Sequence, residues 1–358
     1  MAEDATEGGE DATERDAVAV APSLKITGLH IAGYRSLRRV DWPEDGLGWS
    51  GKVPDIVLVG GANGSGKTTL LETIYRVFDG LRTTIIRTRA APDAQEIVLD
   101  LELTGASVEG VCSLRYAVGA REFLLAHQTE HFRGFLRSGK DEFTQSGLWE
   151  SLQDLARDEE AYMATDIPQV AYFPSARRLS FPKRDQERIA DPTQSALCYR
   201  YEPAEAFGDS ITALFYNARW LDLNAKEEGR PEDATNFSRY AEAFRRFIGP
   251  DKRLLWDHGE LYVKTAEGTL HDLPALSSGE KQVLLFAVEL QRQWYPGSLI
   301  LIDEPELHLH EAWQTTLFEL IRDLQRERGG QAILATQSNH LFGLGEPASA
   351  VVLRKGWP

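Results

Sequence analysis

The sequence predicts an α/β fold with a mostly parallel sheet, an antiparallel β layer and a helical insertion. Apolar, β-branched runs are typical of strands that are buried on both faces of a parallel sheet. Runs that alternate in polarity, or stay apolar between turn residues, are typical of an antiparallel layer. The first kind comprises Ile56–Val59, Ser298–Ile302 and Gln331–Ala335, and the second comprises Leu24–Ile31, Glu96–Leu103 and Val111–Val118. Helical patterns between Glu130 and Pro250 predict the insertion.

Residues 1–22 are predicted to form a disordered acidic tail. Met1–Asp16 holds seven acidic residues against one arginine, which gives a local charge of −6, and it shows no apolar period. An acidic segment of this kind is neither a signal peptide nor a transit peptide. The first ordered element expected after it is an edge strand at Leu24–Ile31, followed by a turn and a second strand near Arg38–Trp42.

A glycine-rich turn follows the strand Ile56–Val59 and leads into a helix. Its residues satisfy the pattern G-x-x-x-x-G-K-[ST], in which backbone N–H groups surround phosphate oxygens and the helix N-terminus favours the anion. The lysine supplies a positive charge to the β and γ phosphates, and the threonine hydroxyl can ligate Mg²⁺. The predicted binding residues are Gly61, Asn63, Gly64, Ser65, Gly66, Lys67, Thr68 and Thr69.

Arg35 is a further candidate for this site. It lies in the turn after Leu24–Ile31, and it would reach the phosphate loop if these first strands pair with Ile56–Val59. A solvated arginine is the alternative.

The helix after the loop is expected at Thr68–Phe78, ended by Gly80. Three arginines that follow could contact nucleic acid, although a solvated face explains them as well. They are Arg82, Arg87 and Arg89.

The middle of the chain predicts mixed secondary structure without a coiled coil. Glu122–His127 is a possible extension of the antiparallel layer, and Val170–Phe173 is a strand stopped by Pro174. Arg177 and Arg178 follow in a loop. Helical patterns occur at Lys140–Thr165, Ala204–Leu223 and Asp233–Phe247. No heptad persists for three or four repeats, so a long coiled-coil arm is not expected.

The C-terminal part predicts a hairpin, a buried helix and a site at the end of a buried strand. The hairpin joins Leu254–Trp256 to Glu260–Lys264, and a short strand follows at Thr269–Leu273. Leu276–Gln282 opens a helix that continues to Trp294. Ser277 and Ser278 suit the start of this helix, and capping alone would explain them.

Asp303 and Glu304 end the buried strand Ser298–Ile302. In a chain with a phosphate loop, two acids in this position are candidates for a metal carboxylate and a general base. His308 and His310 are nearby, but Mg²⁺ prefers oxygen ligands, so a structural or interfacial role is expected for them. A helix at Ala312–Arg328 and a last strand at Ala350–Leu353 complete the pattern.

Composition narrows the function classes. The net charge of −16 argues against a general nucleic-acid coat. No apolar run reaches 18 residues, so no membrane span is expected. Cys112 and Cys198 form no metal-binding spacing and suggest a reducing cytoplasm.

Taken in order and spacing, these motifs resemble those of ABC-type ATPases. The closer resemblance is to the SMC-like and RecF-like branch, and especially to OLD-type or "AAA family" ATPases of bacterial defence systems. Ile31–Leu37 matches their I-x-G-[YF]-[RK]-S-[LF] motif, and Ile302–His310 matches IDEPE-x-H-L-H. Trp313 and Gln314 match the W-Q pair that follows. The resemblance implies a P-loop NTPase fold and a cytoplasmic ATPase with ATP and Mg²⁺ as cofactors.

The resemblance also implies roles for individual residues. Asp303 would hold Mg²⁺ through water, and Glu304 would polarise the attacking water. The signature turn would cap the γ-phosphate of a second subunit and so produce a nucleotide-sandwich homodimer; its residues are Ser278, Gly279 and Glu280. Two departures imply slow hydrolysis. Gln337 stands where the family has its switch histidine, and no glutamine loop can be placed after Val170–Phe173.

The domains expected are an ATPase lobe in two parts, 23–129 and 251–358, with a helical insertion lobe at 130–250. OLD nucleases continue into a Toprim domain, for which about 18 residues after His340 leave no room. The leading hypothesis is therefore a sensor or regulatory ATPase beside a separate effector, a nuclease or toxin, as in Septu, retron or PARIS-type systems. A RecF-like DNA repair clamp is the alternative, so DNA binding stays possible. A transporter ATPase subunit fits less well.

Overall fold

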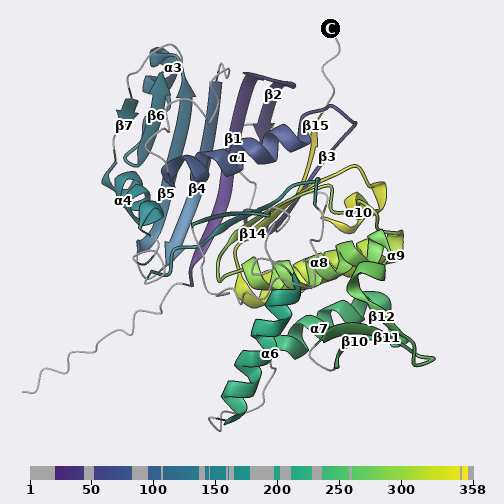
Figure 1. Cartoon of the computed structure of the whole chain (residues 1–358). Helices are drawn as coiled ribbons and strands as arrows, with labels where there is room; N and C mark the ends of the chain where they lie inside the picture. The colour runs from purple at the N-terminus through teal and green to yellow at the C-terminus, as the bar shows by residue number, and fades with distance from the viewer. Residues whose placement is uncertain are drawn as a thin grey trace, which may run out of the picture.

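The computed structural model describes residues 21–43, 52–82, 96–105, 108–136, 142–144, 146–158, 160, 165–177, 197–201, 211–227, 236–257, 260–346 and 349–353. The predicted acidic tail lies almost wholly outside these residues, as do Arg87, Arg89 and Arg178. The fold is α/β, as predicted, with layers that can be followed in Figure 1.

A parallel sheet of six strands forms the centre of the molecule. Its order is β15-β3-β14-β13-β8-β9, and every neighbouring pair is parallel. The three strands predicted from buried apolar runs lie side by side in it, because each has apolar residues on both faces. The strands are β3 (Ile56–Gly61), β8 (Val170–Phe173), β9 (Cys198–Arg200), β13 (Leu299–Asp303), β14 (Gln331–Thr336) and β15 (Ala350–Leu353).

A second sheet of six strands forms the outer layer, in the order β2-β1-β4-β5-β6-β7. All its pairs are antiparallel except β5 with β6. Helix α1 (Lys67–Arg82) lies between the two sheets (Figure 1), and its apolar side chains share one core with both. The strands are β1 (Ser23–Tyr34), β2 (Leu37–Trp42), β4 (Glu96–Gly105), β5 (Val108–Gly119), β6 (Phe132–Leu136) and β7 (Glu142–Thr144).

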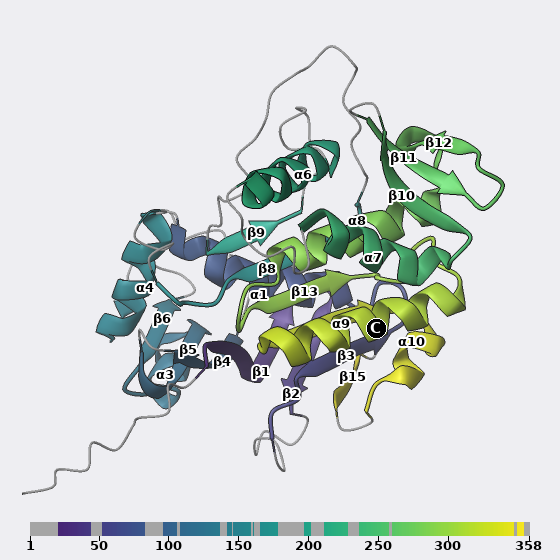
Figure 2. The same ribbon diagram turned by 90° about the horizontal axis from the view of Figure 1, so that it is seen from below.

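Helices cover the other face of the parallel sheet. Alternate residues of the strands, such as Leu58, Ile300 and Leu334, pack there against α8 (Ser278–Gln293) and α9 (Glu311–Arg328) in a second core. Figure 2 shows these helices from below, with a smaller group of elements beyond them. That group contains α6 (Ile211–Glu227), α7 (Asn236–Ile248) and the sheet β10 (Lys252–Asp257), β11 (Glu260–Thr265) and β12 (Leu270–Asp272), with a 3₁₀ turn, η2 (Leu273–Ala275), after it.

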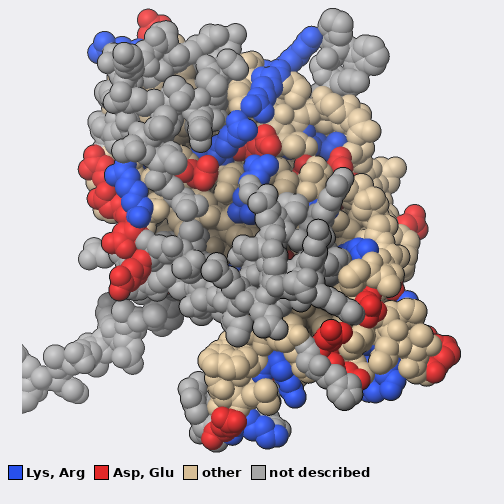
Figure 3. Space-filling model, in the orientation of Figure 1, with Lys and Arg blue, Asp and Glu red and all other residues tan. Residues whose placement is uncertain are grey.

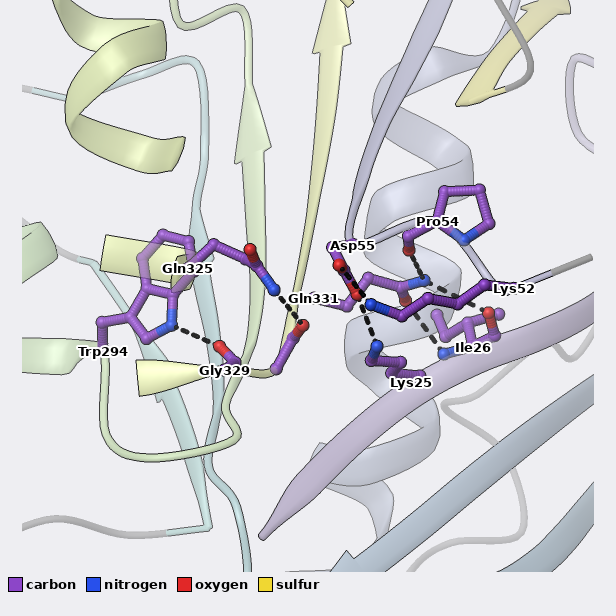
Figure 4. Close-up of polar contacts among 10 residues, drawn as sticks. Lys25, Ile26, Lys52, Pro54, Asp55, Trp294, Gln325, Gly329 and Gln331 are labelled. Carbon is purple, nitrogen blue, oxygen red and sulfur yellow. Dashed lines mark hydrogen bonds and ion pairs between the residues drawn. The ribbon is translucent and has the colours of Figure 1, made fainter. Parts of the chain in front are cut away.

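A buried glutamine joins the two large sheets. Gln331, at the start of β14, accepts a hydrogen bond from the backbone N–H of Ile26 at 2.9 Å and donates to the carbonyls of Ile26 at 3.3 Å and Pro54 at 2.9 Å. Beside it, Lys25 and Asp55 form an ion pair of 2.5 Å (Figure 4). These contacts hold β1 of the outer sheet against the N-terminal ends of the parallel strands. Asp303 and Thr336 lie at the opposite, C-terminal ends of their strands.

Several sequence-based expectations for the first strands and helix are wrong. Leu24–Ile31 is not an edge strand, because β1 pairs with β2 on one side and β4 on the other, and it does not pair with β3. Gly80 does not end α1, which continues to Arg82. Glu122–His127 does not extend the sheet. It lies largely in α3 (Arg121–Ala126), because β5 and β6 are parallel and parallel strands need a crossover connection.

The segment 130–250 is not one helical lobe. Its strands β6 and β7 complete the outer sheet, and β8 and β9 complete the parallel sheet. Helix α4 (Gly147–Arg157) occupies less of the chain than the predicted Lys140–Thr165 and packs beside α1. Among the described residues of this segment, α6 and α7 lie outside both large sheets, beside the small sheet (Figure 1). The contribution of this segment to both sheets could not be predicted, since strand order depends on contacts distant in sequence.

Candidate functional site

The phosphate loop joins β3 to α1, as the motif predicts. The loop folds back on itself through a hydrogen bond from the N–H of Ser65 to the carbonyl of Ala62, at 3.1 Å. Gly66 has a φ of 100°, in the region that favours glycine. A Cβ on Gly66 would lie 2.3 Å from Leu37 Cδ2, so the loop also needs glycine for its close contact with the turn before β2.

Lys67 closes over this loop. Its Nζ donates to the carbonyl oxygens of Gly61 at 2.7 Å and Ala62 at 3.2 Å. The side chain is 5% exposed, so its ammonium group is held inside the loop and directed at the space that the loop surrounds. Loop carbonyls are weaker partners for an ammonium group than phosphate oxygens, which carry full charge. Lys67 is therefore placed to exchange these carbonyls for the oxygens of a bound phosphate.

Thr68 and Asp303 meet at the end of β13. Thr68 Oγ1 donates to Asp303 Oδ2 at 2.8 Å, although the two residues are 235 positions apart. Asp303 is fully buried, and its Oδ1 has no hydrogen bond of normal geometry among the described residues. Burial raises the pKa of Asp303, against the opposing effects of Thr68, Arg177 and Ser175. A hydroxyl beside a carboxylate with an unused oxygen fits Mg²⁺, which binds oxygen and keeps part of its water shell.

Glu304 and Gln337 face each other next to Asp303. Gln337 Nε2 donates to Glu304 Oε1, which confirms that the end of β14 adjoins the end of β13. Glu304 has a φ of 47°, an uncommon value for a residue with a side chain, and its N–H donates to the carbonyl of Ala335 at 2.8 Å. This turn directs the carboxylate away from the sheet edge toward Gln337.

Glu306 is a residue of the site whose role sequence reasoning missed. Its carboxylate accepts from Thr336 Oγ1 at 2.8 Å and from the N–H of Gln337 at 2.7 Å. It therefore holds the segment that carries Gln337 beside the turn that carries Glu304. The only sequence signal for Glu306 is its position in the D-E-P-E turn. A solvated surface acid is an equally good interpretation of that position.

The signature turn begins α8 with a capping box. The Ser277 hydroxyl accepts from the N–H of Glu280 at 3.2 Å, and Glu280 accepts from the N–H of Ser277 at 2.9 Å. Lys252 Nζ donates to Glu280 at 2.7 Å. Burial raises the pKa of Glu280, but these hydrogen bonds outweigh it and the pKa is lowered. Glu280, predicted to bind nucleotide, thus serves here to begin the helix, whereas the adjacent Ser278 is exposed.

Gly279 places this turn against the segment after Glu306. A Cβ on Gly279 would lie 2.8 Å from the carbonyl oxygen of His308 and 2.9 Å from the Trp313 ring. No hydrogen bond joins Ser278 or Gly279 to the phosphate loop of the same chain in the part of the chain that the structure describes. The structure therefore brings together the loop, Asp303, Glu304 and Gln337, but not the signature turn.

Arg35 lies near the loop by a different route from the one expected. It is in the turn between β1 and β2, which contacts Gly66 through Ser36 and Leu37. Its guanidinium is 3.5 Å from Glu72 on α1, and its side chain is 43% exposed. Arg76 and Arg200 approach the same carboxylate at 3.5 and 3.8 Å. Three guanidinium groups around one carboxylate leave positive charge beside α1, and Figure 3 shows basic side chains gathered over this region.

The segment after β8 takes the place where a glutamine loop was sought. Pro174–Arg177 lies at the same sheet edge as Asp303, because β8 and β13 are parallel neighbours. It carries Ser175, which lowers the pKa of Asp303, and the buried Arg177. A serine and an arginine thus occupy the segment directly after this strand.

The histidine residues that the structure describes belong to no cluster suited to a metal ion. Among the described residues, no group of three His, Cys, Asp or Glu side chains is arranged to hold a metal ion. His310 Nδ1 accepts from the N–H of Trp313 and caps α9, which supports the structural role expected for it. The described helices include none that is both long enough and apolar enough to cross a bilayer.

Comparison with known proteins agrees with this geometry. The family described as "AAA domain, putative AbiEii toxin, Type IV TA system" matches residues 56–343. The search of curated proteins gave no significant match. Among solved structures, the SMC head bound to the C-terminal winged-helix domain of ScpA is similar, with a TM-score of 0.51 and 17% identity over 89% of this chain and 91% of the other.

Two further SMC head structures are similar over most of their length. The head with an extended coiled coil, bound to the C-terminal domain of ScpA from Pyrococcus furiosus, has a TM-score of 0.47 and 15% identity, and covers 89% of this chain and 91% of that one. The head from Thermotoga maritima has a TM-score of 0.43 and 14% identity, with coverage of 90% and 92%. The family match confirms the predicted resemblance to AAA-family ATPases, and the first of the three SMC heads shows a similar fold.

Proposed function

The chain belongs to the family described as "AAA domain, putative AbiEii toxin, Type IV TA system", and we propose from this premise that it binds Mg·ATP and hydrolyses it slowly. The observation that carries the proposal is the meeting of Lys67, Thr68, Asp303, Glu304 and Gln337 where three parallel strands end. These side chains are separated by up to 270 positions, and each has the chemistry that its position requires.

Each residue has a distinct task in this proposal. Lys67 exchanges its two loop carbonyls for the β and γ phosphates. Thr68 and the unused oxygen of Asp303 would hold the Mg²⁺ shell, and a bound ion would supply positive charge beside the phosphates. Glu304 accepts a hydrogen bond from the attacking water and orients it. Gln337 is neutral and cannot take up a proton as a switch histidine could, which is the reason to expect slow turnover.

The assignment is tested by separating binding from hydrolysis. Lys67→Ala should abolish ATP binding in calorimetry, because it removes the charge that the phosphates need. Glu304→Gln should bind Mg·ATP with an affinity close to that of the original chain and should lose at least about a hundredfold in hydrolysis rate, the typical effect of removing a general base. Loss of binding in Glu304→Gln would contradict the role given to this residue.

We further infer that the active species is an ATP-bridged homodimer. The phosphate loop would surround one side of the nucleotide, whereas the exposed Ser278 and the buried Gly279 begin α8, and a helix N-terminus suits the γ-phosphate of a second subunit. In light scattering, Glu304→Gln with Mg·ATP should be dimeric, and Glu304→Gln combined with Ser278→Arg should be monomeric while still binding ATP. If the single variant stays monomeric with ATP, the sandwich arrangement is wrong.

The effector activity that this ATPase would control is proposed to reside in a separate protein. The described residues contain one complete catalytic constellation, at the loop, and Cys112 and Cys198 are both buried and form no disulfide, in keeping with a reducing cytoplasm. A regulatory ATPase of a bacterial defence system, with a nuclease or toxin as its effector, fits these observations and the family.

The SMC-like fold and the arginines around Glu72 favour the alternative, a DNA repair clamp. ATP-dependent binding of labelled duplex DNA, measured by anisotropy, would favour the clamp.

A further inference from the structure

Arg177 is a buried arginine whose hydrogen bonds converge on the candidate catalytic turn. Its side chain is 3% exposed. Nη1 donates to the carbonyl oxygens of Pro174 at 2.6 Å and Asp303 at 2.5 Å, and Nη2 donates to the carbonyl of Glu304 at 2.8 Å. All three acceptors are backbone groups, so this side chain fixes main chain at the end of β8 to main chain at the end of β13.

These contacts determine the conformation of Glu304. The carbonyls of residues 303 and 304 belong to the two peptide units on either side of the Glu304 Cα, and both accept from one planar guanidinium. Glu304 keeps its φ of 47° only if its surroundings hold it there. Arg177 on one side and the carbonyl of Ala335 on the other supply that constraint. A guanidinium is suited to this task, because its donors lie in a fixed fork.

Arg177 also contacts the helix that carries the signature turn. Gln282 Nε2 donates to the Arg177 carbonyl at 3.1 Å, and Arg177 Nε donates to Gln282 Oε1 at 3.5 Å. The guanidinium lies 4.9 Å from the ring centroid of Phe286. Ser278, Gln282 and Phe286 follow one another at intervals of four along α8 and so lie on one face. The exposed end of α8 is therefore joined to the Glu304 turn through one side chain.

The charge of Arg177 is retained in this position. Burial lowers its pKa to about 10, while the nearby carboxylates of Asp303, Glu306 and Glu304 act in the opposite direction. The side chain is therefore protonated at neutral pH and keeps all its donors. A residue that only filled space in this core would not need them.

We propose that Arg177 is a positioning residue that makes hydrolysis depend on the position of α8. A partner nucleotide bound at Ser278 holds α8, Gln282 holds Arg177, and Arg177 holds Glu304 in the orientation that serves the attacking water. The inference rests on the proposed ATPase function. No glutamine loop could be placed after β8, and the inference assigns the coupling role to Arg177 in that segment. The partners of Arg177 at this turn are backbone carbonyls, so in this proposal its loss should affect hydrolysis and not binding.

The test compares Arg177→Lys with a matched control, Arg133→Lys. Arg133 is buried to the same degree, at 2% exposed, and lies 5.3 Å from the Phe135 ring, but it belongs to β6 in the outer sheet. Arg177→Lys should lower the maximal hydrolysis rate about a hundredfold, the effect of misplacing a catalytic group by about 1 Å. Its affinity for a fluorescent ATP analogue should stay within about threefold of the original value, and the control should change neither quantity.

Gln282→Met separates coupling from stability. It cuts the link to α8 but leaves the hydrogen bonds from Arg177 to the Glu304 turn in place, and it serves as the test if Arg177→Lys does not fold. It should form the ATP-bound dimer and hydrolyse about tenfold more slowly. Full hydrolysis activity in Gln282→Met, or a loss in Arg177→Lys no greater than that in Arg133→Lys, would overturn the coupling role. The ATPase function itself is tested independently, since it fails only if the unaltered chain neither binds nor hydrolyses ATP.

Discussion

Asp303 is the residue at which stability and the proposed function oppose each other. A buried carboxylate with one oxygen lacking a normal hydrogen bond is unfavourable in the absence of a cation, and burial raises its pKa. A carboxyl group whose pKa is higher in the folded chain than in the unfolded chain stabilises the fold most when it is protonated. That contribution is lost as the pH rises through the folded-state pKa.

Asp303→Asn should therefore raise the stability of the nucleotide-free protein at neutral pH. Asparagine can still accept from Thr68 Oγ1, but it carries no charge to bury. We expect the melting temperature to rise by roughly 2 °C at pH 7.5, the shift that about 1 kcal/mol produces in a large domain. The gain should shrink as the pH falls from 7.5 through the raised pKa of Asp303, because the protonated carboxyl buries no charge, and Mg·ATP should stabilise the variant less than the original chain.

Differential scanning calorimetry over this pH range provides the measurement. Glu311→Gln is a suitable control, because Glu311 is an exposed acid at the start of α9 and should show no comparable gain. A melting temperature of Asp303→Asn below that of the original chain at pH 7.5 would mean that the carboxylate stabilises the apo fold through its hydrogen bonds.

At the scale of elements, the junction between β1 and β14 fixes the outer sheet to the parallel sheet. β1 has an irregularity in its pairing with β4 between Ile26 and Gly28. Gln331 bonds both backbone groups of Ile26 at this irregularity. A glutamine at the start of a buried strand is an unpromising residue in the sequence, because a polar side chain there would normally be unfavourable. Its partners explain it.

Gln331→Leu should lower the free energy of unfolding by about 2–3 kcal/mol. The substitution keeps the approximate volume but leaves the Ile26 backbone groups and the Pro54 carbonyl without this partner, and a buried unsatisfied group costs about 1–3 kcal/mol. Urea denaturation gives the measurement. Gln325→Leu is the matched control, since Gln325 makes a single long bond of 3.5 Å to Gly330, and it should change stability by less than about 1 kcal/mol. Equal losses in both variants would show that Gln331 does not hold the sheets together.

For the whole molecule, the projecting group of α6, α7 and the small sheet is the proposed docking region for an effector. α6 extends beyond the body of the ATPase in both ribbon views (Figures 1 and 2). Three large apolar side chains near its far end are exposed, namely Trp220 at 59%, Leu221 at 40% and Leu223 at 47%. Clustered exposed apolar residues of this size often mark a protein-binding surface. α7 packs against α8, so the region is in contact with the helix that would respond to ATP.

Trp220→Arg with Leu223→Arg should weaken binding of the protein encoded beside this gene. A charge at the centre of an apolar contact is costly, and we expect at least a tenfold loss of affinity in a pull-down or in calorimetry, about 1.4 kcal/mol. Val111→Arg is the control, because Val111 is 61% exposed but lies on the outer sheet. ATP hydrolysis should be unchanged in both. Undiminished binding by the α6 variant would place the docking surface elsewhere, and nuclease activity of the purified chain alone would contradict the two-protein arrangement.

The sequence by itself determined the phosphate loop, the buried strands of the parallel sheet and the acids at the end of β13. Each of these is specified by a short pattern. A glycine-rich turn between a strand and a helix has few other interpretations, and a β-branched run with no polar face can only be buried on both sides. Lys67, Thr68 and Asp303 could therefore be predicted without knowledge of the fold.

Only the tertiary structure decided how distant segments are arranged. It placed β1 inside the outer sheet, and it divided the segment 130–250 between two sheets and a projecting group. It also gave Arg177, Gln331 and Glu280 partners that lie 28 to 305 positions away in the chain. Periodicity reports which face of an element is buried, but not what it is buried against. Strand order and buried polar contacts follow from packing among segments far apart in sequence, and no local pattern records them.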